Sequence, residues 1–318
     1  MGELTVVVST VLVAAGVIVL ATFTAALDAA LDPAGRPPAA GPAPRGWSAA
    51  LRLPVVESAR LLRQRRRTTV AADRLLWRVG VLGLPVLALL MAGLVPLGPG
   101  TVADSSVGIV WFNALDVTVW ALVWMAGWGP NSVYSLVGGY RFVAQALAYE
   151  LPLMFALTAP AVAAGSLRLT DVVGAQHNVW FAVWMPAAFA VFCVSVAGFS
   201  VWGPLRHPAG VDIAGGVFAE LSGVDRLLML AGRYALLTAG AAIGVTLFLG
   251  GGSGPLLPEW AWVAVKTAAL CAVLILLGRR LPTLRADRFV EVGWLVLLPI
   301  TLLQVLVVSV VSVGQAGG

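Results

Sequence analysis

Four ionisable side chains interrupt segments of the chain that are otherwise apolar. The segments cover residues 107–126, 143–164, 226–250 and 260–278, and the side chains, in the same order, are Asp116, Glu150, Arg233 and Lys266. Glu150 lies about ten residues into its segment, or roughly 15 Å at 1.5 Å per residue, which is close to mid-bilayer. Charges at that depth are costly unless they pair or line a hydrated path. The set therefore predicts a proton or ion path, or a polar ligand chamber; the alternative is a group of structural ion pairs that fix helix packing.

The chain around Glu150 offers further polar groups. Residues 127–142 are rich in glycine and polar side chains, and we expect them to form a loop that leads directly into the helix of Glu150. Gln145 and Tyr149 are four residues apart, so they share a helix face beside the carboxylate. Pro152 lacks a backbone N–H, so it loosens the helix directly after Glu150 and frees a carbonyl group.

The composition identifies a membrane protein. Of the 318 residues, 60% are hydrophobic and only 11% are charged, whereas a soluble domain is about one quarter charged. We expect an all-α, polytopic fold that forms a single transmembrane domain over residues 1–318. Apolar runs long enough to cross about 30 Å of hydrocarbon predict eight spans, at residues 4–27, 75–96, 107–126, 143–164, 179–199, 226–250, 260–278 and 290–313.

Arginine placement predicts the orientation of these spans. Basic residues gather in the first, third, fifth and seventh loops, and the even-numbered loops contain only Arg168. Because cytoplasmic loops are rich in Lys and Arg, the odd-numbered loops should be cytoplasmic, with both termini outside. The seventh loop carries the densest late group, which consists of Arg279, Arg280, Arg285, Asp287 and Arg288.

The first loop has an organisation of its own. Residues 32–46 are rich in Pro, Gly and Ala and should be irregular. Residues 47–67 predict an amphipathic helix with Leu51, Val55 and Leu62 on one side and most arginines elsewhere. Such a helix can anchor the chain to anionic lipid at the cytoplasmic leaflet. It can also act as a lid over a lipid-side entrance for an amphiphilic substrate.

The sequence lacks the motifs of several classes of binding site. The two cysteines, Cys193 and Cys271, lie alone inside apolar segments, which argues against an Fe–S cluster or a structural zinc. The chain has neither a dinucleotide-binding glycine motif nor a phosphate-binding loop, so it should bind neither NADH nor ATP. We expect no bound cofactor, no metal and no nucleic-acid partner.

Three sequence blocks together resemble a known family. The first runs from Gly127-Trp128 through Asn131-Ser132, Tyr134-Ser135-Leu136, Gly138, Arg141 and Ala144-Gln145 to Tyr149-Glu150; the second is Gly254-Pro255-Leu256-Leu257-Pro258 followed by Trp262 and Lys266-Thr267-Ala268; the third is Arg279, Leu281-Pro282, Arg285, Asp287, Gly293-Trp294 and Leu297-Leu298-Pro299. In this order, and with eight spans, they resemble the H subunit of bacterial NADH–quinone oxidoreductase, the subunit 1 family of respiratory complex I. Related subunits anchor membrane-bound hydrogenases.

The resemblance implies a function as well as a fold. It implies a subunit of a proton-translocating translocase that carries no redox centre, joins the membrane arm to the peripheral arm, and helps to build a quinone chamber in the bacterial plasma membrane. Glu150, Lys266, Asp116 and Arg233 would then belong to the proton path. Glu220, Asp225, Arg279, Arg280, Arg285 and Asp287 would line the quinone chamber or face the peripheral arm. The expected partners are the other membrane-arm and peripheral-arm subunits, quinone as substrate, and membrane lipid.

Two departures from the family pattern affect the predicted charges. The fifth loop, 207–220, lacks most of the family's acids, and Gly232-Arg233-Tyr234 replaces a Gly-Glu-Tyr motif. Asp116 stands where the family is small or apolar, so we expect it to be the counter-charge of Arg233. The missing acids keep a hydrogenase-type membrane anchor open as an alternative function. A stand-alone secondary transporter is a third possibility, although the two halves of the chain show no repeat.

Overall fold

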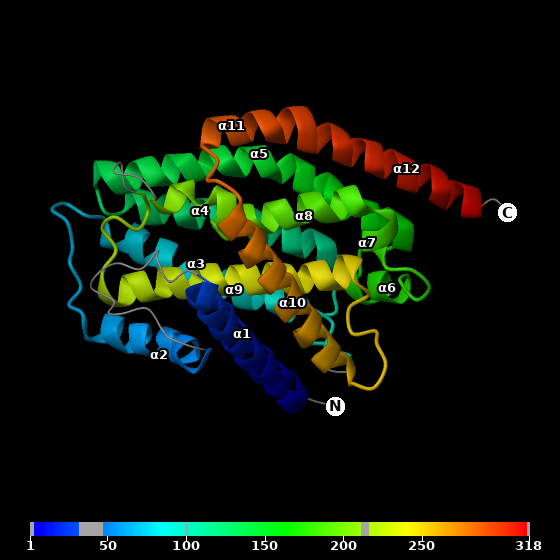
Figure 1. Ribbon diagram of the computed structural model, residues 1–318, viewed down its shortest axis with the longest axis horizontal. Helices are drawn as coiled ribbons and strands as arrows, with labels where there is room; N and C mark the ends of the chain where they lie inside the picture. Colours follow the sequence, from blue (N-terminus) through cyan, green and yellow to red (C-terminus); the bar gives the residue numbers. More distant parts are fainter. Residues whose placement is uncertain (1–2, 32–46, 99–100, 211–215, 317–318) are drawn as a thin grey trace.

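The expected all-helical, multi-pass architecture is confirmed in a computed structural model, which describes residues 3–31, 47–98, 101–210 and 216–316 (Figure 1). The described ranges contain eight helices that are long and apolar enough to cross a membrane. The helices are α1 (Glu3–Leu31), α2 (Trp47–Arg63), α3 (Arg74–Gly93), α4 (Gly108–Trp128), α5 (Val133–Ala164), α6 (Leu169–Gly174), α7 (Phe181–Trp184), α8 (Pro186–Phe199), α9 (Gly223–Phe248), α10 (Glu259–Arg280), α11 (Ala286–Val292) and α12 (Leu298–Ala316).

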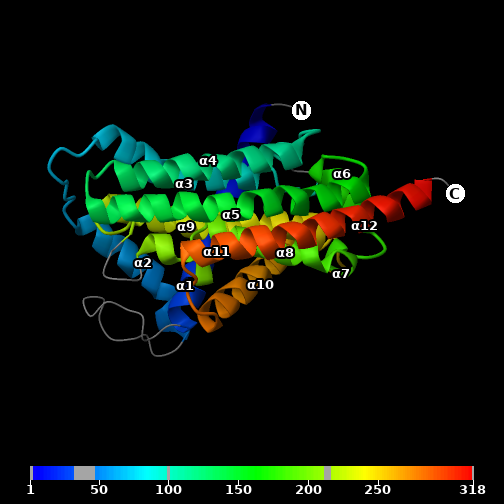
Figure 2. The ribbon, with the colours of Figure 1, turned by 90° about the horizontal axis from the view of Figure 1, so that it is seen from above.

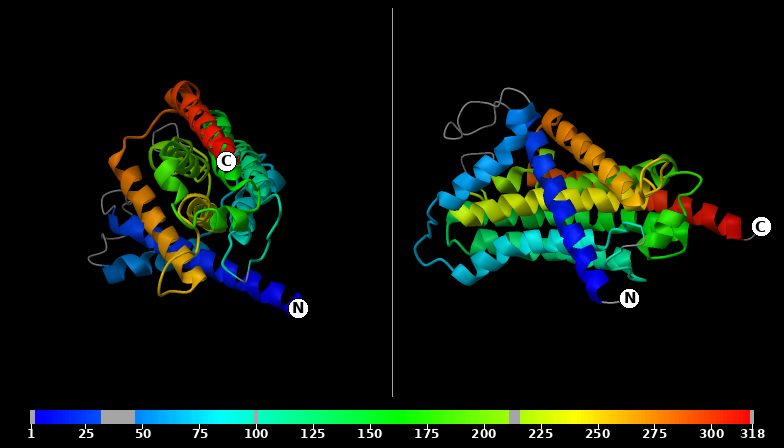
Figure 3. Two further views of the ribbon diagram at one scale, coloured as in Figure 1. Left: turned by 90° about the vertical axis from the view of Figure 1, so that its right-hand side faces the viewer. Right: turned by 90° about the horizontal axis from the view of Figure 1, so that it is seen from below.

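Two long helices organise the bundle. Helix α5 packs against α4, α8 and α12, and helix α9 packs against α3, α1, α10 and α8. Figure 2 shows α4, α5 and α12 side by side, and Figure 3 shows α1 crossing α9 obliquely. Aromatic contacts lock α4, α8 and α9 together, because Phe192 lies 6.0 Å from Phe112 and 5.6 Å from Phe248 between ring centroids. The apolar side chains of these helices therefore form one continuous core.

The predicted alternation of loops is visible in their hydrogen bonds. Odd-numbered loops bond to one another at one end of the bundle, through Arg67 N–H to Ser222 Oγ (2.8 Å), Asp73 N–H to Gly129 O (2.8 Å) and Leu284 N–H to Pro204 O (2.7 Å). At the other end, the Gln176 side chain joins the second half of the fourth loop to α9, since it donates to Thr246 O and accepts from Gly250 N–H. The arginine-rich loops thus share one end, here called the basic end.

The structure corrects the start of the fourth span. Helix α5 begins at Val133, not at residue 143, so most of the expected loop 127–142 is helical and only residues 129–132 connect α4 to α5. Its glycines permit close packing instead: a Cβ on Gly138 would lie 2.3 Å from Val217 N. The helix also continues through Pro152 to Ala164. Glu150 consequently stays near the middle of a longer helix.

A mutation of Gly138 should show whether this position needs glycine for close helix packing or for backbone flexibility. Gly138→Ala places a methyl group against the backbone of residues 216 and 217, and such overpacking costs about 1–3 kcal/mol. Gly93→Ala is the matched control, since none of the described residues lies within 4 Å of a Cβ there. We expect the melting temperature of the purified protein to fall for Gly138→Ala and to stay unchanged or rise for Gly93→Ala. Equal melting temperatures would show that this helix crossing is not tight.

Two further expectations need correction in detail. The amphipathic helix exists but ends at Arg63 rather than at residue 67, and the preceding residues 32–46 lie outside the described residues. The apolar side formed by Leu51, Val55 and Leu62 points away from the bundle, while Leu61, about a quarter turn away around the helix, is fully buried. Helix α2 therefore has one apolar face toward the protein and a second that is free to contact lipid. The fifth span is displaced from the expected residues 179–199, because the chain breaks at Met185 into α7 and α8 and the apolar span runs from Pro186 to Leu205.

Candidate functional site

Two carboxyl groups meet in the interior of the bundle. Asp116 on α4 is fully buried, Glu150 on α5 is 7% exposed, and their carboxyl groups interact directly. Asn113, one turn before Asp116 on the same helix, also lies against Glu150. None of the four carboxylate oxygens accepts a hydrogen bond from a donor in the described part of the chain. The two carboxyl groups therefore lie close together in a region of the interior that offers them few hydrogen-bond donors.

The surroundings of this carboxyl pair are closely packed. Tyr149 lies near Asp116, Glu150 and Trp120, and its ring is seated against Gly198, where a Cβ would come within 2.6 Å of it. The expectation that Gln145 would bond beside Glu150 is not met, because its amide donates to Gly198 O at 2.9 Å. Gln145 thus ties α5 to α8 and leaves the carboxyl pair among aromatic and apolar neighbours.

The expected ion pair between Asp116 and Arg233 is wrong. Arg233 donates from Nε to Ser200 O (3.3 Å) and from Nη2 to Val201 O, whereas Asp116 contacts Glu150. The sequence predicts overlapping depths for both charges, but α9 carries Arg233 close to the basic end of the bundle. Asp116 therefore belongs with the second carboxylate and not with the arginine.

The guanidinium of Arg233 is held in an aromatic clamp. It lies 5.2 Å from the ring centre of Trp202 and 5.3 Å from that of Phe218. The carbonyl groups that it bonds are presented by the end of α8, where Val201 has a φ of +54°. Positive φ is costly for a β-branched residue, so the arginine stabilises a strained turn. Described residues use two of its five N–H groups, which leaves three for a ligand.

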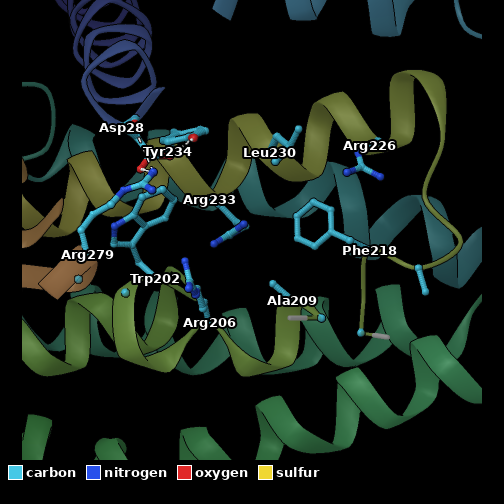
Figure 4. Close-up of a pocket in the computed structure, with 15 residues that line it drawn as sticks. Asp28, Trp202, Arg206, Ala209, Phe218, Arg226, Leu230, Arg233, Tyr234 and Arg279 are labelled. Atoms are coloured by element: carbon cyan, nitrogen blue, oxygen red, sulfur yellow. Dashed lines mark hydrogen bonds and ion pairs between the residues drawn. The ribbon is translucent and has the colours of Figure 1, made fainter. Parts of the chain in front are cut away.

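Arg233 lines a cavity of about 460 Å³ at the basic end, which we call the arginine cavity (Figure 4). Its charged lining consists of Asp28, Arg206, Arg226, Arg233 and Arg279. Among the described lining residues Asp28 is the only acid: it forms an ion pair with Arg279 and accepts a hydrogen bond from Tyr234 OH at 3.0 Å. The cavity is thus basic, with the aromatic walls Trp202, Phe218 and Tyr234.

An apolar cavity of about 420 Å³ adjoins the arginine cavity. The two cavities share Leu230 and Tyr234 in their linings. The apolar cavity is lined by residues of α1, α2, α3 and α9, including Pro54 and Leu61 of the amphipathic helix. Together they offer a polar compartment and an apolar compartment side by side, which suits an amphiphilic ligand.

Lys266 lies in a different place from the other predicted charges. Its Nζ donates to three carbonyl groups, Leu249 O, Gly251 O and Ser253 O, at 2.8–3.0 Å, and lies 4.7 Å from the Trp180 ring centre. A neutral amine has only two N–H bonds, so three donated hydrogen bonds require the charged ammonium. Leu249, at the end of α9, lies about 24 Å from Arg233 along the helix axis, at 1.5 Å per residue. Lys266 and Arg233 are therefore near opposite ends of the bundle.

The remaining predicted residues all lie at the basic end, in two groups. Glu220 accepts a hydrogen bond from Ser132 at 2.7 Å, and Asp225 pairs with Arg66 at 3.1 Å, so these two acids join loops together. Arg280 is exposed, and Arg285 pairs with Asp287 on an exposed surface. The first group holds the basic end together, and the second is available to a neighbouring protein.

Sequence reasoning missed three contributors to these sites. Asn113 was detectable, since it lies three residues before Asp116 and so shares its helix face. Asp28 follows directly on the apolar run 4–27, where the sequence predicts a loop, yet it faces Arg279. Phe218 had no signal, because its contact with Arg233 depends on the path of the fifth loop. In the described ranges no three His, Cys, Asp or Glu side chains converge as a metal site would require.

Comparison with known proteins is consistent with these features. A family model described as NADH dehydrogenase matches residues 7–309. The chain is 35% identical over 265 residues to a protein of Geobacter sulfurreducens that is named as an H subunit (number 2) of NADH-quinone oxidoreductase, and the match covers 80% of each chain. It is 34% identical over 265 residues, with the same coverage, to the H subunit (number 1) of NADH-quinone oxidoreductase from Geobacter metallireducens. With this extent of similarity and eight apolar helices among its described residues, the chain belongs to the NADH dehydrogenase family of multi-pass membrane subunits.

Proposed function

We propose that this chain is the membrane subunit that joins the two arms of a proton-translocating NADH–quinone oxidoreductase. It carries no redox centre and contributes part of the quinone chamber and part of the proton path. The basic end faces the cytoplasm of a bacterial cell, and both termini lie outside the plasma membrane. Family membership and the basic loops at one end support this assignment.

The observation that carries the proton path is the contact between Asp116 and Glu150. Two carboxylates side by side in a medium of low dielectric constant repel strongly, so both do not remain ionised. The pair then holds a proton between its oxygen atoms, which also supplies the donor that these buried atoms otherwise lack among the described residues. Such a group can accept or release one proton with small movements of two side chains.

The other two membrane charges have a different role in this proposal. Arg233 and Lys266 are held by backbone carbonyl groups near opposite ends of the bundle, so in this proposal they act as fixed cations rather than as groups that exchange a proton. The proposed proton path thus combines the carboxyl pair, which exchanges a proton, with two cations whose charge does not change.

The chamber for quinone, the proposed substrate, consists of the arginine cavity and the apolar cavity. The apolar cavity opens between the helices that α2 covers, so an isoprenoid tail can enter from the lipid while the ring reaches the polar compartment. The exposed charges Arg280, Arg285 and Asp287 supply a docking surface for peripheral-arm subunits. Other membrane-arm subunits and lipid cover the apolar outer faces of the bundle.

Isolation of the tagged chain from its native membrane tests this proposal. We expect it to bring down quinone-facing peripheral subunits, and the recovered complex to reduce quinone with NADH. An unrelated tagged multi-pass protein serves as the control for non-specific capture. Recovery of the chain alone, or with a nickel-ligating hydrogenase subunit, would contradict the proposal.

A further inference from the structure

The arginine cavity carries positive charge that its described residues do not balance. Asp28, the only acid among the described lining residues, is already bonded to Arg279 and Tyr234. In the part of the chain that the structure describes, no carboxylate pairs with Arg206, Arg226 or Arg233. The two acids beside the lining, Glu220 and Asp225, are bonded to Ser132 and Arg66 instead. Among the described lining residues, an uncharged ligand would leave this positive charge without a carboxylate partner.

Arg233 supplies a rigid donor for an anion. Its guanidinium is fixed by two backbone carbonyl groups and by the rings of Trp202 and Phe218. A guanidinium that is already ordered loses little side-chain entropy on binding. Its planar set of N–H groups matches the geometry of phosphate and carboxylate oxygens. Figure 4 shows Arg206, Arg226 and Arg233 around the same space.

The adjoining apolar cavity adds a second requirement. It shares Leu230 and Tyr234 with the arginine cavity, and most of its lining is aliphatic. Its one described acid, Glu57, pairs with Arg60. A ligand that fills both compartments has an anionic head and an apolar chain. A small inorganic anion would fill only the first compartment.

We propose that the arginine cavity binds the head group of an anionic phospholipid, with an acyl chain in the apolar cavity. The inference goes beyond the proposed function, because this ligand is not a quinone and competes with quinone for the same space. The cytoplasmic leaflet, which the basic end faces in the proposed orientation, is a source of such lipids.

A lipid-binding measurement on the full chain tests this. The purified chain is titrated with phosphatidylglycerol or phosphatidylcholine, and bound lipid is counted by native mass spectrometry. We expect phosphatidylglycerol to bind about tenfold more tightly or better, since each charge-assisted hydrogen bond contributes about that factor. The double variant Arg206→Gln/Arg226→Gln should lose this preference. Neither side chain has a hydrogen bond to another described residue, so the double variant should fold.

Two further variants test whether the preference for anionic lipid comes from the arginine cavity or from the general surface charge of the protein. Arg78→Gln removes an exposed arginine of α3 that does not line the cavity, and it should keep the preference for phosphatidylglycerol. Asp28→Asn removes the cavity's described acid and should tighten binding of the anionic lipid. Equal binding of the two lipids, or an equal loss in Arg78→Gln and the double variant, would overturn the inference.

Competition with inorganic phosphate and with quinone shows which part of the lipid the cavity recognises and whether quinone uses the same space. Displacement of the lipid by a short-chain quinone supports a shared chamber. Tight binding of inorganic phosphate without any lipid preference would overturn the assignment to an amphiphile. If the chain binds anionic lipid but the complex isolated with it does not reduce quinone, the result would contradict the proposed function. It would still support the lipid site.

Discussion

Replacing Glu150 by glutamine is expected to reduce proton translocation by about a hundredfold or more, the range that loss of a proton-transferring group produces. The amide has nearly the same shape as the carboxyl group but cannot give up or accept the proton at neutral pH. It can still donate to Asp116, so the interior remains packed and the complex should assemble. The measurement is acidification coupled to quinone reduction in sealed vesicles.

The controls for Glu150→Gln address assembly and general charge. Glu150→Asp keeps a carboxyl group and should restore part of the activity. Asp104→Asn removes an exposed acid that pairs with Arg168 and Thr170 at the opposite end from the basic loops, and it should leave translocation unchanged. Translocation at the normal rate in Glu150→Gln would show that the proton does not pass through this pair.

Replacing Lys266 by methionine should have the largest effect on stability, about 3–5 kcal/mol, because the hydrogen bonds of a charged donor are lost and buried acceptors are left without a partner. The substitution removes three hydrogen bonds from a charged donor and leaves the carbonyl groups of Leu249, Gly251 and Ser253 without it. Trp180 also loses its cation contact. The melting temperature of the purified protein should fall strongly, and the connection between α9 and α10 should become sensitive to proteolysis.

Two comparisons distinguish an anchor from a proton relay at Lys266. Lys266→Arg keeps a permanent positive charge, so a fixed cation should be partly restored, whereas a relay would remain inactive. Thr158→Ala removes an exposed hydroxyl that bonds within its own helix and should melt normally. A stable Lys266→Met variant that has lost translocation would contradict the anchoring role.

The sequence was sufficient for the features that depend on local composition. Hydropathy predicted the eight spans, and arginine placement predicted which loops share an end. The glycines of 127–142 were misleading, because glycine permits both flexible loops and close helix crossings; only the contact of Gly138 with residues 216 and 217 decides between them. Helix α5 therefore begins ten residues earlier than hydropathy predicted.

The grouping of charges could not be predicted from depth alone. Asp116 and Arg233 have opposite signs, but a buried arginine can be satisfied by backbone carbonyl groups at a strained turn. Lys266 likewise finds its partners in a loop whose path is set by Gly250 and Gly251, both with positive φ. Side-chain partners that come from irregular backbone leave no periodic signal in a sequence. The contact between Asp116 and Glu150 depends instead on how α4 packs against α5.

The most direct test of the proton path is a double-mutant cycle on the carboxyl pair. Asp116→Asn, Glu150→Gln and the combined variant are compared with the unchanged protein by their rates of vesicle acidification. Groups that act as one unit are strongly non-additive, so we predict that the combined variant loses no more activity than Glu150→Gln alone. Two independent losses that multiply in the combined variant would contradict a shared proton between Asp116 and Glu150.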